Sequence, residues 1–141
     1  MAKKVKKIIR LHIAAGAATP APPVGPSLAQ HGVNIGEFCK KFNDLTKATA
    51  GFKIPVDITI YEDRSYDMKL HEPPASALLK KAAGVEKGSG TPNKIKVGKI
   101  SKTQLQDIAR QKMEDLNTDN LEQAVKIIGG TARNMGIEIT P

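Results

Sequence analysis

The sequence contains no tryptophan and a single cysteine, and aromatic residues account for only 4% of its 141 positions. One cysteine excludes an internal disulfide and a cysteine-rich zinc site. The few aromatic residues all precede Glu72; they are Phe38, Phe42, Phe52, Tyr61 and Tyr66. Proteins that bind loose single strands rely on aromatic platforms. If the second half binds nucleic acid, it should therefore read backbone and folded shape rather than stack on loose bases.

Long apolar runs are also missing, and the longest is far too short to span a bilayer. The opening Met-Ala-Lys-Lys-Val-Lys-Lys is not followed by the apolar region and cleavage site of a signal peptide. These lysines could serve a membrane-surface protein, but the alternation that starts at Ile8 predicts a strand rather than an amphipathic helix. We therefore expect a cytosolic protein with no membrane partner.

Residues that carry chemistry are few and scattered. His12, His31 and His71 lack the spacing of metal ligands. Cys39 falls on the apolar face of a predicted helix, where cysteine usually behaves as a small core residue. A small enzyme would need a constellation that the sequence does not contain. We predict no catalytic site, no metal and no cofactor.

Positive charge is concentrated in one segment. The chain has 22 basic and 14 acidic residues, a formal net charge of +8. Seven lysines and one acid, Glu86, lie between Lys80 and Lys102, so this stretch alone carries +6, whereas residues 103–141 carry −2. The stretch includes the glycine-rich segment Gly-Ser-Gly-Thr-Pro-Asn at 88–93. A cationic loop between helices suits a polyanion, although a solvated linker has the same composition.

The first half predicts a small α/β domain, residues 1–71. Apolar residues alternate over 8–15, 54–61 and 66–70, which predicts a strand followed later by a β-hairpin. A stiff proline-rich segment, 19–26, should lead into a short helix that opens at Pro26. Asn34 should cap a longer helix. Its apolar stripe is expected to comprise Ile35, Phe38, Cys39, Phe42 and Leu45.

The second half predicts a three-helix domain with a short strand pair, residues 72–141. Pro73 and Pro74 mark the boundary, and Gly84 should end the first helix. Ser101 with Gln104 forms a capping box for the second helix, and the third should begin near Asp119. Residues 136–139 predict a short closing strand. The fold class expected for the chain is thus α+β, in two small domains.

Gly129 and Gly130 interrupt the helical pattern of the last helix, and each costs about 1 kcal/mol relative to alanine. The helix could end at Gly129. Alternatively, it continues for another turn to Gly136, and the bare backbone lets a partner approach closely beside Thr131, Arg133 and Asn134. The residues alone leave both interpretations open.

Several motifs together resemble the ribosomal protein L11 family of the large subunit. They are Pro-Pro-Val-Gly-Pro-Ser-Leu at 22–28, Gly-Val-Asn-Ile at 32–35, Glu-Phe-Cys-Lys at 37–40, Pro-Pro-Ala at 73–75, Leu-Lys-Lys-Ala-Ala-Gly at 79–84, Gly-Ser-Gly at 88–90 and Gly-Thr-Ala-Arg-Asn-Met-Gly at 130–136. The resemblance runs essentially end to end and fits the bacterial or organellar form better than the archaeal or eukaryotic cytoplasmic one. Gly129 departs from it, because many members carry a larger residue there.

The resemblance implies a non-enzymatic protein at the base of the ribosomal stalk. Its C-terminal domain would grip a compact fold of large-subunit ribosomal RNA in the GTPase-associated region. The matching positions for RNA binding are Pro74, Lys81, Lys87, Gly88, Ser89, Gly90, Thr91, Asn93, Lys94, Lys96, Gly130, Thr131, Arg133, Asn134 and Gly136. The implied location is the ribosome, in the cytoplasm or in an organelle.

The same resemblance implies roles for the first domain. It would face stalk proteins and translational GTPase factors. Thiopeptide antibiotics would wedge between the RNA and the positions Pro22, Pro23 and Pro26. Bacterial members are often methylated on lysine, and the matching positions are Lys3, Lys4 and Lys40.

A free DNA-binding protein is the main alternative, because three helices can resemble a homeodomain-like module. The last helix argues against it. Between Asp119 and Arg133 it carries one lysine and one arginine against two acids, which is a poor composition for a major-groove reader.

Overall fold

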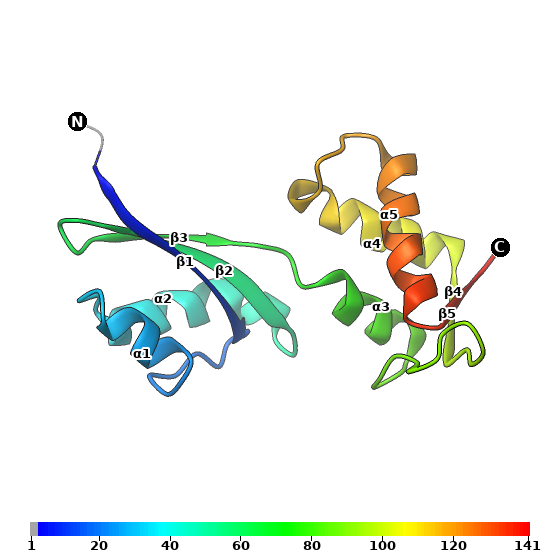
Figure 1. The fold of residues 1–141 in the computed structure, drawn as a ribbon, viewed down its shortest axis with the longest axis horizontal. Coiled ribbons are helices and arrows are strands. Elements are labelled where there is room, and N and C mark those ends of the chain that lie inside the picture. Colours follow the sequence, from blue (N-terminus) through cyan, green and yellow to red (C-terminus); the bar gives the residue numbers. More distant parts are fainter. Residues whose placement is uncertain (1–2) are drawn as a thin grey trace. The chain divides into compact units, whose positions relative to one another are not determined.

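The computed structural model describes residues 3–141, which fold as two compact units that divide between Pro73 and Pro74 (Figure 1). Unit 1 contains β1 (Val5–Ala14), α1 (Val24–Ala29), α2 (Ile35–Thr46), η1 (Lys47–Thr49), β2 (Lys53–Tyr61) and β3 (Tyr66–Leu70). Unit 2 contains α3 (Ala75–Ala83), β4 (Gly98–Ser101), α4 (Lys102–Lys112), η2 (Met113–Asp115), α5 (Leu121–Asn134) and β5 (Ile137–Thr140). The predicted α+β class is confirmed, with a strand and hairpin sheet followed by three helices and a short strand pair.

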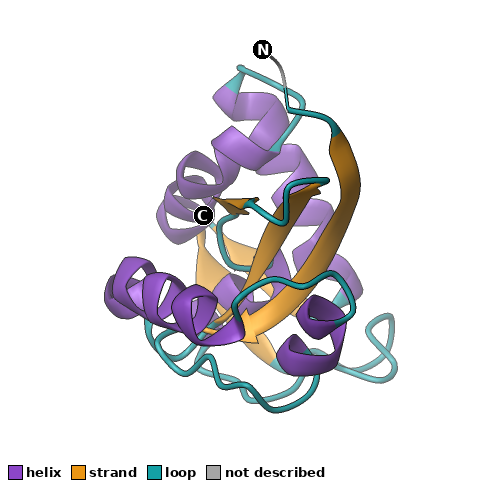
Figure 2. Ribbon diagram, turned by 90° about the vertical axis from the view of Figure 1, so that its left-hand side faces the viewer, coloured by secondary structure: helices purple, strands orange, loops and turns teal. Residues whose placement is uncertain are grey.

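Unit 1 is an antiparallel sheet of order β1-β2-β3 with α1 and α2 on one face (Figure 1). The register places Ile9 opposite Ile58 and Ile13 opposite Ile54. Because side chains alternate across a strand, every second residue of β2 points toward the helices. Each of Ile54, Val56, Ile58 and Ile60 is buried. Figure 2 shows the strands of this sheet, in orange, long and twisted.

Helix α2 seals the unit 1 core with Phe38 and Phe42, which are fully buried with ring centroids 6.1 Å apart. Leu45, expected in the same stripe, is instead 63% exposed. The buried face runs through Cys39 and Thr46, one residue further round the helix. The Thr46 hydroxyl donates to the Phe42 carbonyl at 2.7 Å and accepts from the Gly16 amide at 2.9 Å, so a polar residue is satisfied where leucine was expected.

Helix α1 begins two residues before its predicted start. Pro23 is the N-cap and Pro26 lies inside the first turn, where a helix needs no backbone donor. The spacing of Val24 and Leu28 places both on the buried side, which explains the earlier start. Gly25 packs so closely under the proline-rich segment that a Cβ there would collide with the Pro20 carbonyl.

Unit 2 is organised around the parallel pairing of β4 with β5, in which Gly98 lies opposite Ile137. Helix α3 ends at Gly84, whose φ of 68° is left-handed, and α4 begins with the predicted capping box between Ser101 and Gln104. The core of unit 2 contains no aromatic residue. The buried apolar residues are Leu78, Leu79, Ile100, Leu105, Ile108, Ala109, Ala124, Ile128, Ala132 and Ile137. Helix α5 continues through Gly129 and Gly130 to Asn134, so the interpretation that it ends at Gly129 is wrong.

Candidate nucleic-acid interface

The segment between α3 and β4, residues 85–97, carries three exposed lysines against one acid, Glu86, and we name it the lysine loop. Two backbone hydrogen bonds fasten it to the end of α5. The Ser89 amide donates to the Met135 carbonyl at 2.8 Å, and the Val97 amide donates to the Gly136 carbonyl at 2.9 Å. In Figure 1 the loop, in light green, lies beside the lower end of α5. Segments some forty residues apart in sequence thus form one surface.

Gly136 is the point at which the loop closes against the helix. It is buried and has a φ of 75°. A Cβ there would lie 2.6 Å from the Ser89 Cβ and 2.9 Å from the Ile95 carbonyl oxygen, far inside contact distance. Only glycine fits both the backbone conformation and the space. Of the residues predicted to bind RNA, Gly136 is therefore placed beneath the surface, where it positions the loop.

Between these two fastenings the loop folds on itself. The amides of Lys94 and Ile95 donate to the Thr91 carbonyl at 3.0 and 2.9 Å, and the Thr91 amide donates to the Ser89 hydroxyl at 3.1 Å. The Lys96 ammonium donates to the Pro92 carbonyl at 2.9 Å. These bonds fold the middle of the loop into a turn, with Gly90, Thr91, Asn93 and Lys94 exposed around it.

The ammonium groups of the loop are available to a partner. Lys87, Lys94 and Lys96 are exposed, and none of them forms an ion pair within residues 3–141. Ile95 alternates with two of these lysines and is 58% exposed. Cations that no carboxylate neutralises retain their full attraction for phosphate.

Helix α5 presents a bare backbone next to the loop. A Cβ added at Gly130 would meet nothing within 4 Å, so nothing inside the protein requires glycine there. The exposed side chains of Arg133 and Asn134 lie one turn further on, and the Thr131 hydroxyl points back to the Ile127 carbonyl at 3.4 Å. Gly129 differs, because it is buried and its Cβ would touch Ile139 at 3.4 Å. Gly129 is therefore enclosed by side chains of unit 2, whereas Gly130 faces open space.

Two predicted RNA-binding residues lie on α3. Pro74 is the N-cap of this helix and Lys81 lies in its last turn, next to the loop. A helix rises 1.5 Å per residue, so the two are about 10 Å apart along the axis. The structure thus gathers the loop, Lys81 and the end of α5 together, with Pro74 at the far end of α3.

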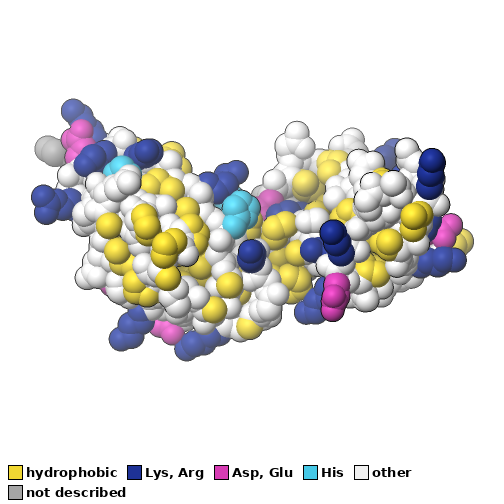
Figure 3. Space-filling model, turned by 60° about the horizontal axis from the view of Figure 1, so that its bottom comes forward, with side chains coloured by type: hydrophobic (Ala, Val, Ile, Leu, Met, Phe, Trp, Pro, Cys, Tyr) yellow, Lys and Arg dark blue, Asp and Glu magenta, His cyan; other side chains and the backbone are white. Residues whose placement is uncertain are grey.

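In unit 1 the predicted antibiotic-facing residues form an exposed apolar surface. Pro22, Pro23 and Pro26 are all exposed, and the peptide bond between the first two is cis. The collision that any Cβ at Gly25 would meet shows that this segment packs tightly on α1. Figure 3 shows hydrophobic side chains gathered on the face of unit 1 that carries α1.

The three predicted methylation sites lie in two places. Lys40 is exposed on α2, whereas Lys3 and Lys4 precede β1 and lie beside the β2–β3 turn. The Lys3 ammonium lies 3.1 Å from the Asp63 carboxylate and 5.7 Å from the centre of the Tyr61 ring. Hydrogen bonds from Ser65, together with Lys3, lower the pKa of Asp63 to about 2.

One polar cluster of unit 1 was not anticipated from the sequence. Asp57 on β2 accepts two hydrogen bonds from the Arg10 guanidinium and lies 2.9 Å from the His71 imidazole. Arg10 foremost, and then His71, hold the pKa of this carboxyl well below its usual range against the opposing effect of burial. The pairing of β1 with β2 brings Arg10 to Asp57, and the pairing of β2 with β3 brings His71 to it, so no local motif could have shown the cluster.

Within residues 3–141, no group of three or more histidine, cysteine or carboxylate side chains is arranged to hold a metal ion. Cys39 is buried, and burial raises the pKa of its thiol. In the same described part of the chain, no helix has the length and apolar character needed to cross a membrane.

An exposed basic loop held against a glycine-bearing helix, in a unit without aromatic residues, defines a protein of the class that binds folded nucleic acid. Comparison with protein families identifies which one. Residues 71–139 match the family described as ribosomal protein L11, RNA binding domain, and residues 9–66 match ribosomal protein L11, N-terminal domain. The chain belongs to the ribosomal protein L11 family. It is a ribosomal protein that binds ribosomal RNA, and its family is structural rather than enzymatic.

Proposed function

We propose that the chain binds large-subunit ribosomal RNA in the GTPase-associated region, through the lysine loop, the last turn of α3 and the exposed end of α5. The observation that supports this best is the fastening of unpaired lysines beside the open backbone of Gly130. Lysines supply affinity through phosphates, while a bare helix backbone lets an RNA groove approach closely. Folded RNA is read by shape in this way, without aromatic stacking.

The proposed mechanism is architectural. Unit 2 clamps the RNA, and unit 1 forms the stalk base, where it contacts stalk proteins and supports the translational GTPase factors. No residue of the chain takes a chemical step, and hydrolysis belongs to the factors. The chain would act on ribosomes of the cytoplasm or of an organelle.

The decisive experiment is crosslinking in cells followed by sequencing of the attached RNA. We expect one dominant footprint in large-subunit ribosomal RNA. Titration of the full chain with that RNA element, in competition with duplex DNA, tests the alternative of a DNA-binding protein. Equal affinity for the duplex, or a footprint scattered over many RNAs, would refute the proposal.

We further propose that the exposed prolines of α1 and the preceding segment contribute to a thiopeptide site on the protein–RNA complex. A rigid surface with few donors suits an apolar ligand, because little ordering is needed on binding. Pro23→Ser should weaken thiopeptide binding at least tenfold and leave RNA affinity within twofold of the wild type. Equal loss of both would mean that the segment is only structural. Methylation of Lys3, Lys4 and Lys40 is likewise proposed, and mass spectrometry of the native protein tests it.

A further inference from the structure

A groove on unit 2 shares Gly130 and Arg133 with the candidate interface, whereas its other lining residues were not predicted to bind RNA. It lies between the start of α4, the middle of α5 and β5, and has a volume of about 330 Å³. Its lining residues are Lys102, Leu105, Val125, Lys126, Gly129, Gly130, Arg133 and Ile139. This volume falls in the lower part of the range of about 300–1,000 Å³ that small-molecule sites occupy.

Gly129 contributes to the floor of the groove. A methyl group at this position would touch the side chain of Ile139 at 3.4 Å and that of Leu105 at 3.8 Å, so any larger side chain would occupy the floor. The buried backbone of Gly129 thus forms part of the floor, and the exposed backbone of Gly130 lies beside it. Such a slot accepts a flat, apolar body at low steric cost.

Its rim is entirely cationic. Lys102, Lys126 and Arg133 line the groove without any acidic residue, and none of the three forms an ion pair in the described part of the chain. A ligand that matches both features has a flat apolar body joined to an anionic group. A nucleotide, with its base and phosphate, has this chemistry.

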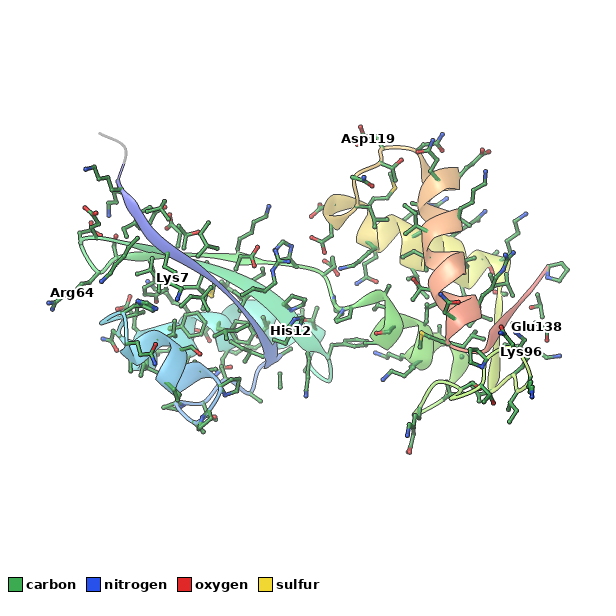
Figure 4. The ribbon with its side chains drawn as sticks, in the orientation of Figure 1. Lys7, His12, Arg64, Lys96, Asp119 and Glu138 are labelled. Carbon is green, nitrogen blue, oxygen red and sulfur yellow. The ribbon has the colours of Figure 1, made fainter. Side chains whose placement is uncertain are left out.

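The groove is also continuous with the lysine loop. A second hollow of about 310 Å³ shares Arg133 and Ile139 with it and reaches Lys96 of the loop. Figure 4 shows Lys96 close to Glu138, the acidic residue that lines this second hollow and lies 3.4 Å from Lys99. An RNA strand that follows the loop would thus be led past Arg133 into the groove. This continuity favours RNA over an acidic protein segment as the occupant.

We propose that the groove holds one unstacked nucleotide of the bound RNA, with its base against the backbone of Gly129 and Gly130 and its phosphate near Lys126 or Lys102. The inference rests on the proposed function, because it assigns a subsite to the same RNA. It adds a base-binding position to a surface whose lack of aromatic residues excludes ring stacking. Aliphatic walls replace the rings.

The test uses the full chain and the large-subunit RNA element. Gly129→Ala places one methyl on the floor and removes a helix glycine, so the melting temperature should stay the same or rise. We expect RNA affinity to fall about fivefold with an unchanged salt slope, because no charge is lost. Chemical acylation of RNA 2′-hydroxyls should show one nucleotide whose reactivity changes in the wild-type complex and not in the variant complex.

Lys102→Gln with Lys126→Gln tests the rim without altering the groove floor. The salt slope should fall by about one to two units, because each lost phosphate contact removes about one. Arg110→Gln, an exposed cation of α4 outside the groove, is the matched control and should leave the slope unchanged.

The outcomes separate the two proposals. If the wild type binds the RNA but Gly129→Ala matches it in affinity and footprint, the nucleotide subsite is wrong and the proposed function stands. The subsite is equally wrong if the variants leave RNA binding unchanged and alter only the amount of other ribosomal proteins that copurify with the chain. The occupant of the groove is then a protein segment. A wild type that does not prefer the RNA to duplex DNA refutes the proposed function itself.

Discussion

Each unit contains eleven basic and seven acidic residues, so the two carry the same formal charge of +4. They arrange it differently. In unit 1 the ion pairs are Lys3–Asp63, Arg10–Asp57, Lys41–Glu37 and Lys47–Asp44. In unit 2 the excess is concentrated between Lys80 and Lys102, where seven lysines stand against one acid, and the lysines at 87, 94 and 96 of the lysine loop have no carboxylate partner among the described residues. The comparison teaches that local arrangement, rather than net charge, identifies the surface for a polyanion.

The largest effect should come from the loop itself. Replacing Lys87, Lys94 and Lys96 together by alanine should reduce RNA affinity by about a hundredfold or more at moderate salt and lower the salt slope by up to about three units. Filter binding over a series of salt concentrations measures both quantities. The matched control replaces three exposed lysines of unit 1, at 40, 53 and 69, which should change neither. Equal salt slopes for the two triple variants would show that the loop lysines contribute no more to RNA binding than the lysines of unit 1.

A second prediction concerns the glycine that fastens the loop. Gly136→Ala should lower the free energy of unfolding by about 2–3 kcal/mol, because it combines a left-handed φ with overpacking against Ser89. RNA affinity should fall with it, since the loop is displaced. Gly84→Ala is the control: its φ of 68° is similar, but a Cβ there meets nothing within 4 Å, so only about 1 kcal/mol should be lost. Chemical denaturation of both variants gives the comparison. Equal decreases in the free energy of unfolding would show that close packing of the loop against Gly136 adds no cost to the substitution.

A third prediction tests paired charge in unit 1. Asp57→Asn should cost about 1–2 kcal/mol at neutral pH, because it weakens the hydrogen bonds from Arg10 and His71. The pKa of Asp57 is lower in the folded than in the unfolded chain, whose ordinary value is about 3.9. This stabilisation is therefore present above about pH 4 and is lost as the pH falls through the depressed value. Unfolding of wild type and variant at a series of pH values should converge in acid; curves that stay parallel would contradict it.

The smallest effect is expected at Gly130. Changing it to alanine should stabilise unit 2 by up to about 1 kcal/mol, because the new methyl meets no protein atom. RNA affinity should nevertheless fall a fewfold, with an unchanged salt slope, if RNA approaches the bare backbone. A more stable variant with undiminished affinity would mean that Gly130 has no part in binding.

Sequence periodicity predicted the elements well wherever burial decides structure. The alternation of Ile54 to Ile60, the capping box at Ser101 and the stop at Gly84 are all local signals, and the structure contains each of them. Leu45 shows where helical periodicity fails as a predictor of burial. An apolar stripe covers a range of angles around the helix, and tertiary packing decides whether a residue at its edge is buried or exposed. The start of α1 at Val24 shows a second failure. Proline is tolerated throughout the first turn of a helix, so Pro26 alone could not show at which residue the helix begins.

The candidate site could likewise be predicted from the sequence only in part. Composition located the lysine loop, and the resemblance supplied the individual residues. Neither could show that Ser89 and Val97 bond to the end of α5, because contacts between distant segments leave no local pattern. The groove over Gly129 was missed for the same reason: Lys102 and Lys126 come from different helices and meet only through the fold.

Because β4 pairs with β5, and Gly98 lies 39 residues before its partner Ile137, the binding surface cannot form until the second strand has been synthesised. The lysine loop leaves the translating ribosome about forty residues before β5 does, and at about 5–20 residues per second that is a delay of about 2–8 seconds. During this interval the loop has neither the Met135 carbonyl nor the Gly136 carbonyl to bond to. A nascent chain therefore carries the charge of the interface before it has the shape. Recognition of RNA by shape begins only when the last strand has been made.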